Sequence, residues 1–347
     1  MNPIRTALAS YGKSGMNFHA PLLSANEKFE LYKILERTRN EAVKKYPYVQ
    51  LARDYDELIR DDRIELIVVN TPDSTHYEYT SRALEAGKHV VVEKPFTLKY
   101  RQAMDLIELA DKKGLALSVF HNRRWDGDFK TVRAILSEQL LGRLVEYESH
   151  YDRYRNYIEE ETWKEDDASG RGLLYNLGSH MIDQALVLFG RPEQVLADIR
   201  HFRTGTKVDD NYEVWLKYPG IKVSICGSYL VREPGPRYIL HGTHGSFLKW
   251  GVDPQEEALK EGKMPVGESW GKEDEENWGL LHTEINGQAY RGKYETLAGD
   301  YPSYYDNIYN VLRNGAKPEV SGEEAALVIK VIEAAYESFR TMKAVKI

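Results

Sequence analysis

The chain has 347 residues and a formal net charge of -7, from 47 basic and 54 acidic residues. This length can bury a large core and favours two domains, and the negative charge argues against a nucleic acid partner. The single cysteine, Cys226, excludes an internal disulfide and fits a reducing cytoplasm. We see neither a secretory signal nor an apolar run near the roughly 20 residues that span a bilayer, so we expect a cytoplasmic protein without a membrane partner.

Predicted strands and helices alternate along the first third of the chain. We expect strands at residues 4–10, 31–35, 64–70, 90–92 and 116–120, and helices from Met16 onward and at 55–61, 77–86 and 100–113. Alternation of this kind predicts a parallel, doubly wound sheet. The first domain is therefore expected to be α/β and to cover residues 1–122.

The pattern changes after Phe120. Strand-like runs at 144–154, 194–203, 211–217, 222–230, 237–241 and 245–250 follow with few helices between them, which favours one large, mostly antiparallel sheet. Helices are expected at 129–138 and 254–261, and a capping box at Ser321 begins an amphipathic helix over 322–342. We predict an α+β domain over 123–347, with helices on one face of an open sheet; the last helix could pack back on the first domain.

A glycine-rich turn, Ser10-Tyr-Gly-Lys-Ser-Gly15, follows the first predicted strand. It matches the dinucleotide fingerprint of a Rossmann domain, except that Ser10 replaces the first glycine. Gly12 would let a pyrophosphate approach the backbone, and Gly15 would let the next helix pack against the strand. That helix would direct its positive end at the phosphates, with Lys13 and Ser14 beside them. The turn predicts NAD or NADP as cofactor.

Charged residues end the second predicted strand, in Glu36-Arg37-Thr38-Arg39. Glu36 stands where an acid commonly holds the ribose hydroxyls, and its carboxylate would repel the 2′-phosphate of NADP. Arg37 and Arg39 could hold that phosphate instead, or be ordinary surface charges. The residues alone lean slightly to NAD.

Lys94 follows the apolar strand Val90–Val92, in Glu93-Lys94-Pro95. Ligands of open α/β sheets bind beyond the carboxyl ends of the strands, and Pro95 ends this strand because it has no amide hydrogen. An ammonium that is desolvated there beside Glu93 can donate or accept a proton. A solvated Lys-Pro turn is the alternative.

Other candidate residues lie at further strand ends and on one helix. Thr71, Pro72 and His76 follow the strand 64–70, and His76 either lines a cofactor cleft or caps the next helix. In the second half, His180 and Asp183 are three residues apart and share a helical face, so the acid could orient the histidine. Asn176 would join that face if the helix begins early.

Four features together resemble the glucose–fructose oxidoreductase/inositol dehydrogenase family, usually called Gfo/Idh/MocA. They are the strand leading into Ser10–Gly15, Thr71-Pro72 with His76, Glu93-Lys94-Pro95, and Gly178-Ser-His180 with Asp183. The resemblance covers nearly the whole chain and is greatest to the NADP-dependent scyllo-inositol dehydrogenase branch. It implies a nicotinamide cofactor, oxidation of a sugar or polyol hydroxyl, Lys94 and His180 at the reacting carbon, and homo-oligomers built on the open face of the C-terminal sheet.

The resemblance leads to a hydride-transfer mechanism in which Lys94 or His180 takes the proton of the reacting oxygen, with Asn176 and Asp183 beside the histidine. Asn122 and Trp125 are assigned to the cofactor. Tyr151, Arg153, Tyr154, Arg155 and Arg124 are assigned to the substrate hydroxyls, and no metal is expected.

Asn176 departs from the family pattern, which has aspartate there; an amide can hydrogen-bond a hydroxyl but cannot take a proton. This departure leaves open a dinucleotide-binding sensor with altered catalysis. Reduction of an oxidised sugar is another alternative. Tetrapyrrole and dihydrodiol substrates are mostly apolar, so they fit the arginine, asparagine and tyrosine side chains named above poorly.

Overall fold

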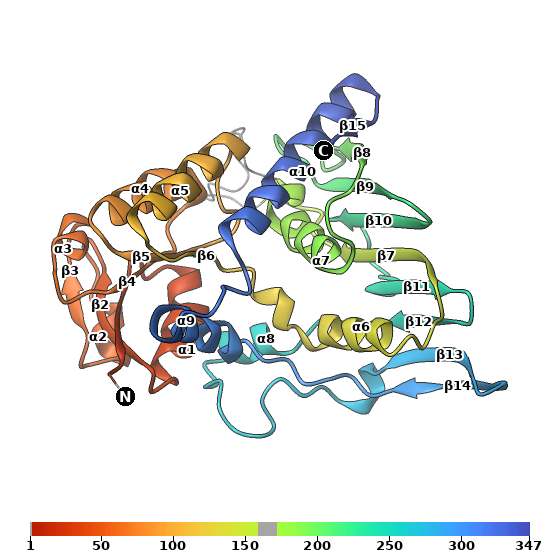
Figure 1. Cartoon of the computed structure of the whole chain (residues 1–347), viewed down its shortest axis with the longest axis horizontal. Coiled ribbons are helices and arrows are strands. Elements are labelled where there is room, and N and C mark those ends of the chain that lie inside the picture. Colours follow the sequence, from red (N-terminus) through yellow and green to blue (C-terminus); the bar gives the residue numbers. More distant parts are fainter. Residues whose placement is uncertain (1, 159–171) are drawn as a thin grey trace. The chain divides into compact units, whose positions relative to one another are not determined.

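The computed structural model describes residues 2–158 and 172–347 (Figure 1). The chain forms two compact units. The first comprises the residues up to Trp125 with Pro254–Trp270 and Asp300–Ala326, and the second comprises Asp126–Asp253, Gly271–Gly299 and Leu327–Ile347. Residues 254–270 and 300–326 therefore group with the first unit, although they follow residue 122 in the sequence.

The first unit contains a six-stranded parallel sheet in the order β3-β2-β1-β4-β5-β6. Its strands are β1 (Ile4–Leu8), β2 (Phe29–Leu35), β3 (Gln50–Ala52), β4 (Leu66–Val69), β5 (His89–Val92) and β6 (Leu117–Val119). Every residue of β4 is buried, because helices cover both faces of the sheet. The predicted Rossmann architecture is confirmed, and the strand order reverses between β1 and β4, where such sheets bind ligands.

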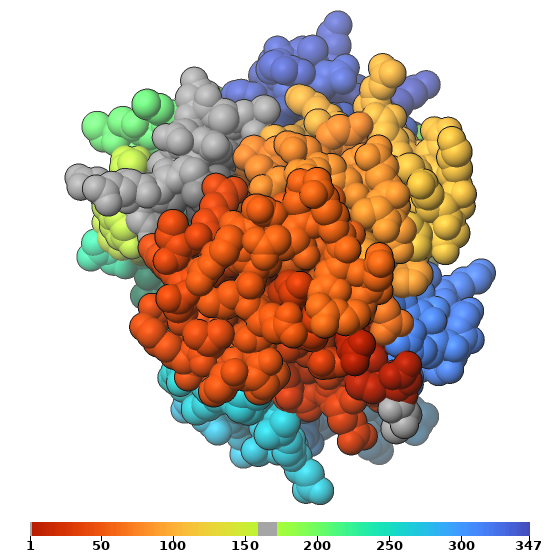
Figure 2. Space-filling model, turned by 90° about the vertical axis from the view of Figure 1, so that its left-hand side faces the viewer, coloured from red at the N-terminus to blue at the C-terminus, as the bar shows by residue number. Residues whose placement is uncertain are grey.

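Helices flank this sheet. The alternation predicted α1 (Ala20–Ser24), α3 (Asp56–Ile59), α4 (His76–Glu85) and α5 (Tyr100–Lys113), but it did not predict α2 (Glu41–Lys45). From later in the chain come α8 (Gln255–Lys260) and α9 (Pro302–Asn314). Figure 1 shows α4 and α5 together on one face of the sheet, with α1 and α9 on the other. In Figure 2 the segment from β1 to α5 occupies the centre of the visible face.

Helix α9 was not predicted, and it explains why residues 300–326 belong to the first unit. Its residues Tyr304 and Tyr305 are 1% and 0% exposed. Tyr304 meets Phe120 edge-to-face at 4.8 Å between ring centroids, and Tyr305 meets Phe29 at 5.4 Å. Burial of these aromatic rings is what attaches the helix to the sheet.

The second unit contains a nine-stranded sheet in the order β14-β13-β12-β11-β7-β10-β9-β8-β15. Its strands are β7 (Leu144–Asp152), β8 (Gln194–Arg200), β9 (Asn211–Tyr218), β10 (Ile221–Ser228), β11 (Tyr238–Gly242), β12 (Gly245–Lys249), β13 (Gly279–Ile285), β14 (Gln288–Tyr294) and β15 (Val345–Lys346). Neighbouring strands are antiparallel except β7 and β10, which confirms the mostly antiparallel sheet. The hairpin β13–β14 and strand β15 were not predicted.

Helices cover one face of the second sheet. They are α6 (Gly127–Ser137), α7 (Ser179–Phe189) and the part of α10 (Gly322–Thr341) that follows Ala326. Tyr238 of β11 donates to Gln184 of α7 at 2.8 Å, and Ala197 of β8 donates to Ser338 of α10 at 3.2 Å. The capping box that starts α10 is present, since Glu324 N donates to Ser321 Oγ at 3.2 Å. Among the described residues no helix is long and apolar enough to cross a membrane.

Candidate active site

The glycine-rich turn lies where the strand order reverses, and Asn70 fastens it to the end of β4. Ser10 N donates to Asn70 Oδ1 at 3.0 Å, and Asn70 Nδ2 donates back to Ser10 O at 2.9 Å. A Cβ on Gly15 would stand 2.5 Å from Ser10 O, so this position must be glycine. Asn70 was not predicted as a site residue, although a polar residue at the end of a buried strand beside β1 was a usable signal.

The turn has open space where a pyrophosphate would approach it. A Cβ on Gly12 would meet only Ser10 Oγ, at 3.4 Å. Ser10, in place of the first glycine, supports the turn because its Oγ accepts the Gly12 N–H at 3.2 Å. A π-helical turn, η1 (Gly15–His19), then leads into α1, so the glycine-rich turn stands at the start of a helical segment, whose partial positive charge favours an anion. These residues fit a dinucleotide.

The carboxylate of Glu36, which directly follows β2, is bound by backbone N–H groups inside the protein. The side chain is buried, and its two oxygens accept the N–H groups of Glu41 at 3.2 Å and Ala42 at 2.9 Å, at the start of α2. Arg53 Nη1 donates to the carbonyls of Glu36 and Arg39 at 2.7 Å each, which fixes the loop. A carboxylate at a helix N-terminus is stabilised there by the partial positive charge of the backbone.

The arginines after Glu36 lie on the surface of the first unit. Arg37 and Arg39 are both exposed. The Nη2 atom of Arg37 is 3.5 Å from the hydroxyl of Tyr79 in α4. The loop after β2 therefore offers guanidinium groups to solvent, whereas the acid that would oppose a 2′-phosphate is turned to α2.

His76 holds two strand-end loops together. Its side chain is buried; Nδ1 lies 2.8 Å from Pro95 O, and Nε2 lies 3.0 Å from Thr71 O. His76 is also the first residue of α4. The ring thereby connects the loop after β4, with Thr71 and Pro72, to the residues that follow Lys94.

Glu93, directly after β5, is bound to the glycine-rich turn. Its Oε1 accepts a hydrogen bond from Ser14 Oγ and lies 3.1 Å from His19 Nε2, while Oε2 accepts the N–H of Lys94 at 3.0 Å. Burial alone would raise the pKa of Glu93. Hydrogen bonds from His19 and Ser14, together with the charges of His19 and Lys94, outweigh burial and lower the pKa to about 2. The half-buried Lys94 therefore follows a carboxylate that is ionised at neutral pH. The Lys94–Pro95 peptide bond is cis.

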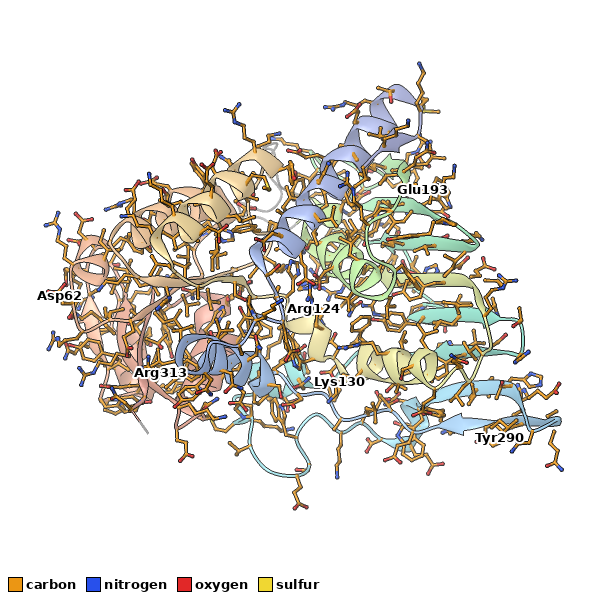
Figure 3. The ribbon with its side chains drawn as sticks, in the orientation of Figure 1. Asp62, Arg124, Lys130, Glu193, Tyr290 and Arg313 are labelled. Atoms are coloured by element: carbon orange, nitrogen blue, oxygen red, sulfur yellow. The ribbon has the colours of Figure 1, made fainter. Side chains whose placement is uncertain are left out.

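The residues that follow β6 form a buried turn, η3 (Asn122–Trp125). Arg124 is labelled in Figure 3; its Nη1 lies 3.1 Å from Glu324 Oε2 and also donates to Glu319 O. The carbonyl of Trp125 accepts the N–H of Asp300 at 2.9 Å. Arg124 thus makes structural bonds within the first unit, and its substrate role stays a prediction.

In the second unit, His180 and Asp183 lie on α7 and Asn176 lies on the π-helical turn before it, η5 (Leu174–Gly178). The helical backbone thus begins before Asn176. His180 and Asp183 are 4% and 1% exposed, and Asn176 is half-buried. Turns of π-helix inside α-helices are frequent at functional sites, and here one precedes His180 while another precedes α1.

The predicted substrate residues at the end of β7 separate into different environments. Tyr151 is buried and lies near two guanidinium groups, with Arg237 4.5 Å and Arg153 4.9 Å from its ring centroid. Tyr154 is 44% exposed and carries Arg232 at 4.1 Å. Arg155 lies 5.7 Å from the ring of Tyr229. The structure therefore brings Tyr151 and Arg153 together and places Tyr154 in another contact. Among the described residues no cluster of His, Cys, Asp or Glu could hold a metal ion.

Both parts of the chain match known protein families. Residues 4–121 match the oxidoreductase family with an NAD-binding Rossmann fold, and residues 133–347 match the C-terminal alpha/beta domain of that family. The scyllo-inositol 2-dehydrogenase (NADP(+)) of Bacillus subtilis is 37% identical over 345 residues, which are 99% of this chain and 96% of that protein. A solved oxidoreductase structure from Bacteroides fragilis has 52% identity, a TM-score of 0.93 and full coverage of both chains. Another, YvaA from Bacillus subtilis, has 37% identity and a TM-score of 0.96, and the match covers 100% of this chain and 99% of that one.

These matches agree with the turn at Ser10–Gly15 and with the two sheets, and they confirm the resemblance seen in the sequence. The chain therefore belongs to the Gfo/Idh/MocA family of oxidoreductases, with NAD or NADP as its cofactor.

Proposed function

We propose that this protein transfers hydride between NADP and the CH–OH group of a sugar or polyol related to inositol. The observation that carries the proposal is the hydrogen bond from Ser14 to Glu93, because it joins the dinucleotide turn to the residue before Lys94. An amine beside a dinucleotide site at the end of a central strand is suited to handle the proton of a hydroxyl as it is oxidised.

In this proposal Lys94 and His180 hydrogen-bond the reacting oxygen, and one of them takes its proton. The nicotinamide ring supplies or accepts the hydride. Asp183 orients His180, and Asn176 hydrogen-bonds a substrate hydroxyl. Tyr151, Arg153, Tyr154 and Arg155 are candidates for the remaining hydroxyls, because a polyol needs many donors and acceptors at fixed positions.

The preference for NADP rests on the loop after β2. Glu36 is turned to the α2 amides, so its charge is stabilised away from the loop surface, while Arg37 and Arg39 are exposed. A guanidinium group is well suited to a phosphate because its donors match the phosphate oxygens. The relative in Bacillus subtilis is also named for NADP(+).

We further propose a cytoplasmic homo-oligomer in which the open face of the second sheet binds a second copy of the chain. One row of paired residues crosses seven strands on this face and is apolar toward both ends: Leu196, Trp215, Ser224, Glu148, Ile239, Leu248 and Leu280. Leu196 is 41% exposed. Replacing Leu196 by glutamate should weaken association in sedimentation experiments, and an unchanged molecular mass would oppose this interface.

The function is tested with a panel of inositols and aldoses, each with NAD and with NADP, by the absorbance of the reduced nicotinamide. We expect NADP-dependent turnover of at least one polyol. Tight binding of NADPH without turnover in either direction across the panel would refute the dehydrogenase proposal.

A further inference from the structure

A line of buried side chains leads from α9 to Lys94 within the first unit. The hydroxyl of Tyr305 lies 2.7 Å from His19 Nδ1, and His19 Nε2 lies 3.1 Å from Glu93 Oε1. His19 and Tyr305 are both 0% exposed. The Glu93 carboxylate then accepts the backbone N–H of Lys94. We call these residues the Tyr305–His19–Glu93 chain.

Each member of the Tyr305–His19–Glu93 chain has a defined hydrogen-bonding role. Burial raises the pKa of Tyr305 well above its ordinary value, so the hydroxyl keeps its proton and can donate to His19 Nδ1. With Nδ1 accepting from Tyr305, Nε2 is the ring nitrogen that donates to Glu93. The titratable groups around the Glu93 carboxylate include His19, Lys94, Tyr304 and Tyr305.

Three donors hold the Glu93 carboxylate. Oε1 receives Ser14 from the dinucleotide turn and His19 from η1, and Oε2 receives the N–H of Lys94. Ser14 and the Lys94 N–H hold one oxygen each, and a further donor from the buried His19 ring restricts the rotation of the carboxylate. A lysine has a long, flexible stem, so the position of its ammonium depends on a fixed backbone and a fixed counter-charge.

We propose that His19 and Tyr305 are positioning residues for Lys94. They orient the Glu93 carboxylate, and Glu93 in turn holds the backbone and the charge of Lys94 in register with the dinucleotide turn. The inference rests on the proposed function for Lys94. Supporting hydrogen bonds matter in such sites because a misplacement of about 1 Å can lower a rate about 100-fold.

Two adjacent tyrosines of α9 provide a matched test. Tyr305→Phe removes the hydroxyl that reaches His19, and Tyr304→Phe removes an equally buried hydroxyl that lies 3.0 Å from Ser118 Oγ. Each variant loses one hydrogen bond and keeps its ring. We expect kcat to fall about tenfold in Tyr305→Phe and to stay within about twofold in Tyr304→Phe, with similar urea midpoints and NADPH affinities.

His19 variants separate positioning from packing. His19→Gln keeps an N–H that can reach Glu93, whereas His19→Leu fills similar space without a donor. The inference predicts that His19→Gln retains more of the wild-type kcat than His19→Leu at comparable stability. Equal kcat in these two variants would indicate that His19 only fills the core.

A second measurement does not depend on turnover. The rate at which acetic anhydride modifies the Lys94 amine is followed against pH by peptide mass spectrometry, with the exposed Lys112 as an internal standard. A loosely held carboxylate stabilises the ammonium less, so the labelling midpoint should move to lower pH by about half a unit in Tyr305→Phe and not in Tyr304→Phe.

The labelling result decides the inference, and the panel of sugars decides the proposed function. A shifted Lys94 midpoint in an enzyme that oxidises no sugar would keep the positioning role and refute the reaction. Identical Lys94 labelling in the wild type and both tyrosine variants would overturn the positioning role, whatever the substrate proves to be.

Discussion

Gly15 and Gly12 belong to one turn, but an added methyl group meets different surroundings at each. On Gly15 it would lie 2.5 Å from Ser10 O and 2.8 Å from Asn70 Nδ2, between the partners that join β1 to β4. Overpacking costs about 1–3 kcal/mol, and each strained hydrogen bond adds about 0.5–1.5 kcal/mol. We expect Gly15→Ala to lower the free energy of unfolding by about 2–4 kcal/mol and to weaken dinucleotide binding.

Gly12→Ala is the matched control for that prediction. Its Cβ would meet only Ser10 Oγ at an ordinary 3.4 Å, and Gly12 is not among the glycines with positive φ. The unfolded chain loses freedom with alanine, so the unliganded protein should be as stable or up to about 1 kcal/mol more stable. NADPH binding should nevertheless weaken, because a methyl group blocks the pyrophosphate.

Urea unfolding without ligand and fluorescence titration with NADPH measure the two effects separately. A Gly15→Ala protein with the wild-type urea midpoint would refute the steric reasoning. A Gly12→Ala protein that binds NADPH with wild-type affinity would show that the pyrophosphate does not lie over Gly12.

Three further predictions concern charged side chains. Lys94→Ala should lower kcat about 10²–10⁴-fold while NADPH affinity is retained, as measured by turnover and titration, and wild-type turnover would remove Lys94 from the reaction. Glu36→Gln should lower the free energy of unfolding in urea by about 1 kcal/mol, because the start of α2 loses its carboxylate. The ratio of NADP affinity to NAD affinity should stay nearly unchanged. A large gain in NADP affinity would place the carboxylate at the ribose. The pKa of Glu93 is lowered to about 2, so its stabilisation is present above pH ~4.5 and is lost as the pH falls toward 2. The difference in unfolding free energy between wild type and Glu93→Gln should therefore shrink as urea titrations move from pH 6 to pH 3, and a constant difference would contradict that pKa.

Local sequence pattern was enough to predict most strands of the first sheet and to suggest candidate residues at their ends. Val90–Val92 is a continuous apolar run, as expected of a strand buried on both faces. Such a run can be recognised without knowing which strands lie beside it. Because parallel strands end at one edge of a sheet, Lys94 and the turn at Ser10–Gly15 could be assigned to that edge from order alone.

Side-chain partners far apart in sequence could not be predicted in the same way. The position of Glu36 after β2 fits a ribose ligand, and only the place of the α2 N–H groups shows where its carboxylate goes. His19 and Tyr305 are separated by 286 positions, and nothing in either segment indicates the other. The hairpin β13–β14 is different, since Asn286-Gly287, both with positive φ, is a strong local turn signal from which the hairpin could be predicted.

Asn176 is the residue at which this chain departs from the family pattern, and Asn176→Asp tests what the departure does. It lies half-buried on η5, one helical turn before His180. A carboxylate there would favour the imidazolium and make His180 a stronger base. In the rate of polyol oxidation against pH, the variant should show a higher plateau and an acidic limb moved toward higher pH. If the amide instead holds a substrate hydroxyl through its N–H, aspartate would leave that oxygen without a donor, and the rate should fall at every pH without a shift of the limb. A profile identical to the wild type would contradict both accounts and show that the side chain of Asn176 reaches neither the histidine nor the substrate.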